Sequence, residues 1–233
     1  MPVTHLRPRF AAPVPVPGPP QDPHASPVPL PGPVPLPGAA TFSEIFAGGG
    51  RDAGPVGFAL AQVAGNKPLL WVQDRMSILE AGRPFVRGID APFIHVEARD
   101  ARAALWAMEE GLKCAALSAV VGEIWGNPKA LDFTATRRLA VAAERGGVPA
   151  LLLLFGAAPN LSGARMRWHA SSRPSPPHPH DALAPGAPAW TLELFKARGA
   201  HPGRWDVAHE TDGLRLLAAP GDGQLAEANR RRA

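Results

Sequence analysis

The sequence predicts an α/β fold, with a mainly parallel sheet covered by helices on both faces and extended by antiparallel C-terminal strands. Continuously apolar segments, such as PLLWV at Pro68–Val72 and PALLLLF at Pro149–Phe155, alternate with helical segments. Strands that are apolar along their whole length are typical of parallel sheets, because helices cover both faces. After Phe155 the chain changes to short strands without long helices between them. We expect those strands to pair as antiparallel hairpins.

The first predicted elements are a strand at Thr41–Ala47, a glycine-rich turn and an apolar helix over about Pro55–Ala64. Two short apolar strands follow at Pro68–Val72 and Phe93–Val96. A helix is predicted over Asp100–Lys113, because aspartate is a favoured N-cap residue. The apolar residues of this helix recur with the 3.6-residue period, at Ala101, Ala104, Leu105, Met108 and Leu112.

The next predicted elements are a strand at Ala115–Val121 and an amphipathic helix over Asp132–Gly146. This helix is expected to end at its Gly-Gly pair, because glycine commonly follows the last helical turn. Pro149–Phe155 is the most apolar of the predicted strands. The remaining predicted strands are Ala164–Ala170, Trp190–Ala197, Trp205–His209 and Leu214–Leu217.

The prolines divide the chain into a folded domain and flanking segments. Of the 29 prolines, 14 lie in the first 37 residues, and alternating prolines favour polyproline II over a packed core. We therefore expect a disordered arm over residues 1–40, a folded domain over 41–220 and a basic tail over 221–233. Within the domain, the proline-rich segment 171–188 is expected to be a flexible loop.

The composition argues against several classes of protein. No stretch reaches 18 consecutive apolar residues, so we predict no transmembrane helix. The single cysteine, Cys114, excludes a disulfide framework within the chain. A cytoplasmic location is expected, with no metal and no cofactor. Residues 41–160 carry 12 basic and 12 acidic side chains, and this neutral balance gives DNA binding only weak support.

A degenerate phosphate-binding loop follows the first strand. A Walker loop has the pattern G-x-x-x-x-G-K-[ST], in which the lysine neutralises phosphate and the hydroxyl holds magnesium. Gly49 and Gly54 have the required spacing, but Pro55 and Val56 stand where the lysine and the hydroxyl residue belong. We therefore predict no tight ATP binding and no catalytic residues. Glu123 is either a Walker-B-like carboxylate for a metal or a residue that pairs locally at a strand end.

Residues that point away from the predicted core are candidates for partner contacts. Trp106 lies about 120° from the centre of the apolar stripe on its helix, at 100° per residue, and Arg102 is beside it. The outer face of the following helix carries Arg137, Arg138 and Arg145. Tryptophan and arginine are enriched at interface hot spots, so these residues are predicted partner contacts. The alternatives are burial of Trp106 under another segment and a basic face that is merely solvated.

A second candidate surface lies on the C-terminal strands. Arg165 and Arg167 alternate with apolar residues, so both arginines are expected on one face of their strand. Lys196, Arg198 and Arg204 are expected to join them near the sheet edge. This surface is predicted to contact DNA or an acidic partner.

Several long motifs occur in order between about residues 41 and 218. They are WVQDR at Trp71–Arg75, GRP at Gly82–Pro84, ALWAMEEGLKC at Ala104–Cys114, AVVGE at Ala119–Glu123, TRRLAVAAERGGVPALLLL at Thr136–Leu154, ARMRWHASS at Ala164–Ser172 and WTLELFKARG at Trp190–Gly199. Together they resemble the ImuA family of RecA-like proteins in its alphaproteobacterial form. The resemblance implies a RecA-like core whose phosphate-binding loop is degenerate.

The same resemblance implies a role in DNA-damage tolerance. Members of the family work under the SOS response beside ImuB, a Y-family-like protein, and an error-prone C-family DNA polymerase. The implied function is non-catalytic assembly or recruitment of the translesion complex, with RecA as a possible further partner. Three alternatives stay open: a SulA-type cell-division inhibitor, a RecA-like module that binds DNA directly, and a residual nucleotide-binding enzyme.

Overall fold

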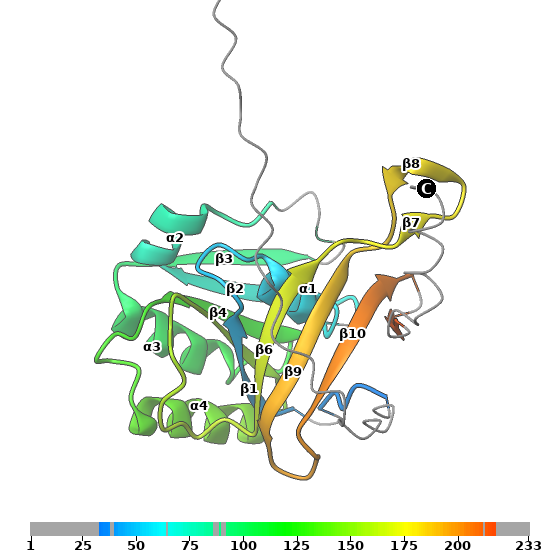
Figure 1. Cartoon of the computed structure of the whole chain (residues 1–233). Coiled ribbons are helices and arrows are strands. Elements are labelled where there is room, and N and C mark those ends of the chain that lie inside the picture. Colours follow the sequence, from blue (N-terminus) through cyan, green and yellow to red (C-terminus); the bar gives the residue numbers. More distant parts are fainter. Residues whose placement is uncertain are drawn as a thin grey trace, which may run out of the picture. The chain divides into compact units, whose positions relative to one another are not determined.

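The protein is built around one nine-stranded mixed sheet (Figure 1). The computed structural model describes residues 33–37, 40–63, 65–85, 89, 92–211 and 213–217. The strands lie in the order β11-β10-β9-β6-β1-β5-β4-β2-β3. The six strands from β6 to β3 in that order run parallel to one another, which confirms the mainly parallel sheet. These parallel strands are β1 (Phe42–Ala47), β2 (Leu69–Asp74), β3 (Phe93–Ala98), β4 (Ala119–Trp125), β5 (Ala150–Phe155) and β6 (Met166–Arg173).

The remaining strands of the sheet are antiparallel to their neighbours. They are β9 (Ala189–Ala197), β10 (Gly203–Glu210) and β11 (Gly213–Leu216). Strand β6 departs from the expected antiparallel arrangement, because it pairs in parallel with β1 on one side. It pairs antiparallel with β9 on the other side. The change from parallel to antiparallel therefore comes one strand later than predicted.

Part of the proline-rich segment 171–188, which is expected to be a flexible loop, is paired in strands. Strand β6 continues to Arg173, and β7 (Pro177–His178) pairs with β8 (Asp181–Pro185) as a separate two-stranded sheet. Figure 1 shows this hairpin extending beyond the end of β6. The expected arm over residues 1–40 lies outside the described residues except for 33–37 and 40, and the expected tail over 221–233 lies wholly outside them.

Three of the four described helices begin at an aspartate cap. The helices are α1 (Gly54–Leu60), α2 (Arg75–Ala81), α3 (Ala101–Gly111) and α4 (Phe133–Gly146). Asp74, Asp100 and Asp132 each accept a hydrogen bond from the backbone N–H three residues ahead, at 2.7–2.8 Å. These bonds satisfy amides that have no partner within the helix. None of the described helices is long and apolar enough to cross a membrane.

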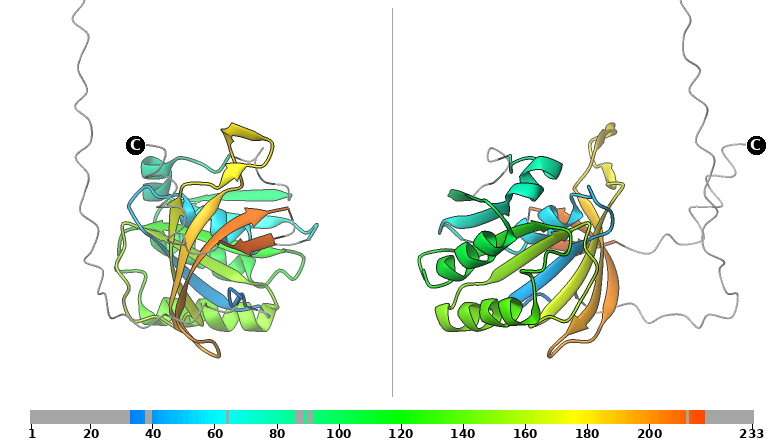
Figure 2. Two further views of the ribbon diagram at one scale, coloured as in Figure 1. Left: turned by 45° about the vertical axis from the view of Figure 1, so that its right-hand side comes forward. Right: turned by 90° about the vertical axis from the view of Figure 1, so that its left-hand side faces the viewer.

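Helices cover both faces of the parallel part of the sheet, as expected (Figure 2). On one face, α3 and α4 bury Ala104, Met108 and Leu139 against residues such as Leu152. On the opposite face, α1 buries Phe58 against Trp168 of β6, with the two rings edge to face and their centroids 5.1 Å apart. The outer surfaces of α3 and α4 are therefore on the side of the sheet opposite to α1.

Candidate functional site

The loop that connects β1 to α1 is closed by one of its own carboxylates. Asp52 accepts a hydrogen bond from the backbone N–H of Gly54 at 2.8 Å. It also accepts bonds from Ser172 of β6, from the backbone N–H at 3.0 Å and from the hydroxyl at 2.6 Å. An amide at the start of a helix is a donor that commonly binds phosphate. Here the Gly54 amide already donates to the Asp52 carboxylate, a negatively charged group of the chain itself.

Two glycines of this loop, Gly48 and Gly54, pack tightly against β6. A Cβ atom on Gly48 would lie 1.9 Å from the Ser171 hydroxyl oxygen, and one on Gly54 would lie 2.9 Å from the backbone of Ser171 and Ser172. Pro55 occupies the first turn of α1, where its missing N–H leaves no helical bond unmade. Close packing therefore explains Gly48 and Gly54, whereas a Cβ on Gly49 would meet nothing within 4 Å.

Glu123 is buried inside β4 rather than standing at its end. Only 3% of its surface is exposed, and it accepts a hydrogen bond from the Trp71 indole N–H at 3.1 Å. Burial raises the pKa of the Glu123 carboxyl, and nearby Asp74 raises that pKa further; hydrogen bonds from Trp71 and Gln73 oppose the rise. No cluster of three or more metal-ligating side chains occurs among the described residues. The Glu123 carboxylate is thus paired inside the sheet with Trp71 of β2, and its Walker-B-like role stays a prediction.

Arg167 corrects one expectation from the sequence, because it does not lie on an open surface. Its side chain is 5% exposed and pairs with Glu44 of β1, which is 1% exposed, at 2.7 Å. Ser162 also donates a hydrogen bond to Glu44. The guanidinium group lies over the rings of Phe46 and Phe195, 5.3 Å from each centroid. Arg167 therefore acts inside the fold and cannot contact a partner directly.

Trp106 lies on the surface, as its position off the apolar stripe predicted. The residue is 61% exposed, so burial beneath a neighbouring segment is ruled out among the described residues. Arg102, one helical turn earlier, is exposed beside it. On α4, Arg137, Arg138 and Arg145 are exposed as well. The predicted outward orientation of all five residues is confirmed, whereas their contact role is not tested by the structure.

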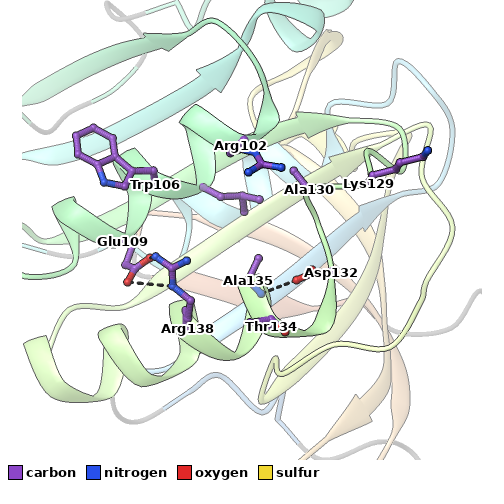
Figure 3. A pocket seen from close by; sticks show the side chains of 10 residues that line it. Arg102, Trp106, Glu109, Lys129, Ala130, Asp132, Thr134, Ala135 and Arg138 are labelled. Carbon is purple, nitrogen blue, oxygen red and sulfur yellow. Dashed lines mark hydrogen bonds and ion pairs between the residues drawn. The ribbon is translucent and has the colours of Figure 1, made fainter.

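These residues surround two adjoining hollows on the outer side of α3 and α4, which we call the α3–α4 groove. Figure 3 shows the residues that line the first hollow. The first hollow, of about 320 Å³, includes Arg102, Trp106 and Lys129 in its lining. The second, of about 550 Å³, includes Arg137 and Arg145. Glu109, Thr134 and Arg138 line both hollows. In Figure 3, Arg138 of α4 reaches across to Glu109 of α3, and Lys129 projects from the loop before α4.

A third hollow, of about 520 Å³, lies on the other side of α4, where the loop before β6 meets the end of β9, and it shares Arg137 and Val141 with the second hollow. Four basic side chains contribute to its lining, namely Arg137, Arg165, Lys196 and Arg198. Arg165 pairs with Glu144 of α4 at 2.7 Å. We call this the Arg165 hollow. Three of the predicted DNA or acidic-partner residues therefore come together here.

Arg204 does not join this hollow. It is exposed on β10, directly opposite Glu193 of β9. The predicted surface of five cations is thus divided among three places: the Arg165 hollow, the buried pair with Glu44 and the β10 surface. The sequence did not indicate Lys129 as a lining residue of the groove. Lys129 lies in the loop before α4, where no helical or strand periodicity shows which way a side chain points.

Comparison with known proteins identifies similar chains. No model of a known protein family matches the sequence. Two curated proteins match, both named Protein ImuA and both from Caulobacter vibrioides, from strains NA1000 / CB15N and ATCC 19089 / CIP 103742 / CB 15. Each is 33% identical over 180 residues, which cover 70% of this chain and 72% of the relative.

Proposed function

The chain belongs to the ImuA family, and from this premise we propose that it is a non-catalytic accessory protein of SOS-induced, error-prone translesion DNA synthesis. In this proposal it assembles or recruits the mutagenic polymerase complex through protein contacts. Its partners are an ImuB-like Y-family protein and an error-prone C-family polymerase, with RecA as a further candidate.

The closed loop after β1 supports the non-catalytic part of the proposal. Phosphate binding at such a loop needs free backbone donors and a lysine. Pro55 stands at the lysine position, and the Asp52 carboxylate occupies the Gly54 amide. A nucleotide phosphate would have to displace a carboxylate held by three bonds to Ser172, two from its backbone N–H and one from its hydroxyl. Both the charge and the contacts of the loop therefore oppose ATP binding.

The observation that carries the proposal is the exposed tryptophan of the α3–α4 groove. Trp106 presents a large apolar side chain to solvent, and Arg102 and Lys129 line the same hollow. Burying such a side chain on binding removes a large apolar area from water, and tryptophan and arginine dominate interface hot spots. The groove therefore has the composition of a protein-binding surface.

The first test is a pull-down with the purified full chain after nuclease treatment. The baits are the ImuB-like protein, the C-family polymerase, RecA and the tubulin-like division protein. We expect capture of the ImuB-like protein, the polymerase or RecA, and we expect Trp106→Ala to weaken it. Leu183→Ala is the matched control, since Leu183 is 98% exposed on the β8 hairpin, away from the groove.

Two results of the pull-down would contradict the proposal. Capture of the division protein alone would favour the SulA-type alternative. Retention of no bait without DNA would mean that any assembly runs through nucleic acid. A Trp106→Ala effect that Leu183→Ala reproduces would indicate a general loss of folded protein, and thermal unfolding of both variants distinguishes that case.

A second candidate function, direct DNA binding, is favoured by the Arg165 hollow. Four basic side chains line this hollow, and Glu144 is the acidic residue among its lining residues. Phosphate contacts by arginine and lysine release counterions, so affinity should fall steeply with salt. Under this alternative, Lys196→Ala with Arg198→Ala lowers the slope of log Kd against log salt for a single-stranded oligonucleotide. An unchanged slope would exclude the hollow as the DNA site.

A further inference from the structure

We infer that the α3–α4 groove binds an acidic peptide segment with apolar anchor residues, supplied by the partner protein. This inference rests on the proposed function, because it names the chemistry of the segment that docks. It commits to a protein segment as the occupant. Nucleic acid is treated as an outcome of the test.

The first argument is the charge of the groove. Six of its lining residues are basic: Arg102, Lys113, Lys129, Arg137, Arg138 and Arg145. Two are acidic, Glu109 and Asp132. Asp132 is committed to capping α4 through the Ala135 amide. Within the described residues, Arg102, Lys129, Arg137 and Arg145 form no intramolecular ion pair, so four cations are available to carboxylates of a partner.

The second argument is the apolar surface between these cations. Trp106 stands exposed at the first hollow, next to the buried Leu105. The second hollow has half-buried Val141 and Ala142 in its lining. Apolar side chains flanked by basic residues complement a segment in which apolar anchors alternate with acidic residues. Such segments bind helical grooves through anchors at intervals of three or four residues.

The third argument is the ion pair that separates the two hollows. Arg138 of α4 donates to Glu109 of α3, with one contact at 3.3 Å, and both residues line both hollows. The Arg138 side chain is 59% exposed, so a carboxylate of the bound segment can reach its guanidinium group. Arg138 then exchanges Glu109 for the partner, or bonds to both through separate donors.

The groove also carries features that disfavour nucleic acid. Glu109 lies at its centre, and the carboxylate would repel phosphates that track along both hollows. Peptide carboxylates are repelled as well, but a peptide can place an apolar anchor at that position, whereas a phosphate backbone is charged at every step. The alternation of apolar and basic lining therefore fits a peptide better than a polyanion.

The test uses fluorescence anisotropy with the full chain. The probes are fluorescein-labelled 20-residue peptides tiled across the ImuB-like protein and the C-family polymerase, together with a labelled single-stranded 20-nucleotide DNA. We expect the bound peptides to be acidic and to contain apolar residues. Trp106→Ala should weaken their binding at least about tenfold. Arg102→Glu with Arg145→Glu should do the same by reversing two charges that line the groove and not the Arg165 hollow. Leu183→Ala serves as the control that leaves binding unchanged.

Four results would overturn the inference. They are binding only to neutral or basic peptides, no binding to any peptide, preference for the DNA probe with the same sensitivity to Trp106→Ala, and binding that ignores every groove variant. Failure of the inference is distinguishable from failure of the proposed function. If Trp106→Ala abolishes capture of the partner in the pull-down but no acidic peptide binds, the docking role of the groove stands. In that case only the proposed acidic peptide chemistry is wrong.

Discussion

The pair formed by Glu44 and Arg167 joins β1 to β6 in the interior, where water cannot screen either charge. Glu44 also accepts a bond from Ser162, and the Arg167 guanidinium lies over the rings of Phe46 and Phe195. Removing one partner of a buried ion pair leaves the other charge uncompensated, and that loss exceeds the net value of the pair itself. The stability of the sheet at the junction of β1 and β6 therefore depends on both residues.

Replacing Arg167 should destabilise the protein far more than replacing its neighbour on the same strand face. We expect Arg167→Ala to lower the free energy of unfolding by about 3–5 kcal/mol, because Glu44 stays buried without its cation. Arg165→Ala should cost about 0–1 kcal/mol, because its pair with Glu144 is partly exposed to water. Urea titration of both variants measures the difference. Equal losses would show that burial of the Glu44 pair has no energetic consequence.

Glu123 should make stability depend on pH. Burial raises its pKa above the ordinary value of 4.5, so the folded state binds the proton more tightly than the unfolded state. The stabilisation from this group is complete below the unfolded pKa and is lost as pH rises through the folded pKa. In Glu123→Gln the amide oxygen still accepts the Trp71 bond but does not ionise. The variant should therefore gain stability relative to the natural protein as pH is raised from 4 to 8.

The measurement is urea unfolding of both proteins across that pH range. A constant difference in unfolding free energy would contradict a raised pKa for Glu123. If Glu123→Gln instead becomes less stable relative to the natural protein as pH rises, the pKa of Glu123 is shifted in the opposite direction.

For single residues, the sequence predicted the direction in which a side chain points better than it predicted the residue with which that side chain pairs. The alternation of β6 placed Arg165 and Arg167 on one face, because successive strand residues point to opposite sides. It could not show that the two differ in burial. The carboxylate that pairs with Arg167 is 123 residues away in the chain, and only the parallel pairing of β1 with β6 brings the two together. The same limit applies to Glu123, whose indole donor comes from β2.

At the scale of elements, α4 and α3 are held close by a glycine. A Cβ on Gly146 would lie 1.8 Å from the carbonyl oxygen of Leu112, at the end of α3. That oxygen belongs to the backbone, so the helices themselves would have to move apart. Gly146 also lines the second hollow of the α3–α4 groove. The spacing of the two helices, and so the width of the groove, depends on this residue.

Gly146→Ala should destabilise the protein although alanine is the better helix former. Overpacking of this kind typically costs about 1–3 kcal/mol, which exceeds the gain of up to about 1 kcal/mol in helix propensity. Gly49→Ala is the control, since a Cβ there meets nothing within 4 Å. It should change stability by less than about 0.5 kcal/mol. Thermal unfolding compares the two, and a Gly146→Ala variant as stable as the control would show that the helices separate freely.

Elements defined by local signals were predicted well, and those defined by distant pairing were not. Asp100 and Asp132 predicted the starts of α3 and α4, because an N-cap side chain bonds to a backbone N–H only three residues ahead. The seven-residue helix α2 was missed, since it is too short to display a clear apolar period. The parallel partner of β6 was also missed, because strand direction is decided by contacts far along the chain. Proline content predicted a loop at residues 171–188, yet the paired β7 and β8 accommodate prolines at their ends.

For the molecule as a whole, the nucleotide-binding position and the proposed docking surface are separate. The loop after β1 is closed onto β6 and leads into α1, which covers one face of the sheet. The α3–α4 groove lies on helices that cover the opposite face. No described contact makes the groove depend on a bound phosphate. Partner binding should therefore be independent of ATP, in contrast to a RecA-like protein that uses nucleotide to gate its assembly.

Isothermal titration of the full chain with the captured ImuB-like partner, in the presence and absence of ATP and Mg²⁺, tests this account most directly. We predict the same Kd in both conditions and a loss of roughly 30-fold, about 2 kcal/mol, in Trp106→Ala. Leu183→Ala should match the natural protein. An affinity that changes with ATP, or one that is untouched by Trp106→Ala, would contradict a nucleotide-independent adaptor that docks through the α3–α4 groove.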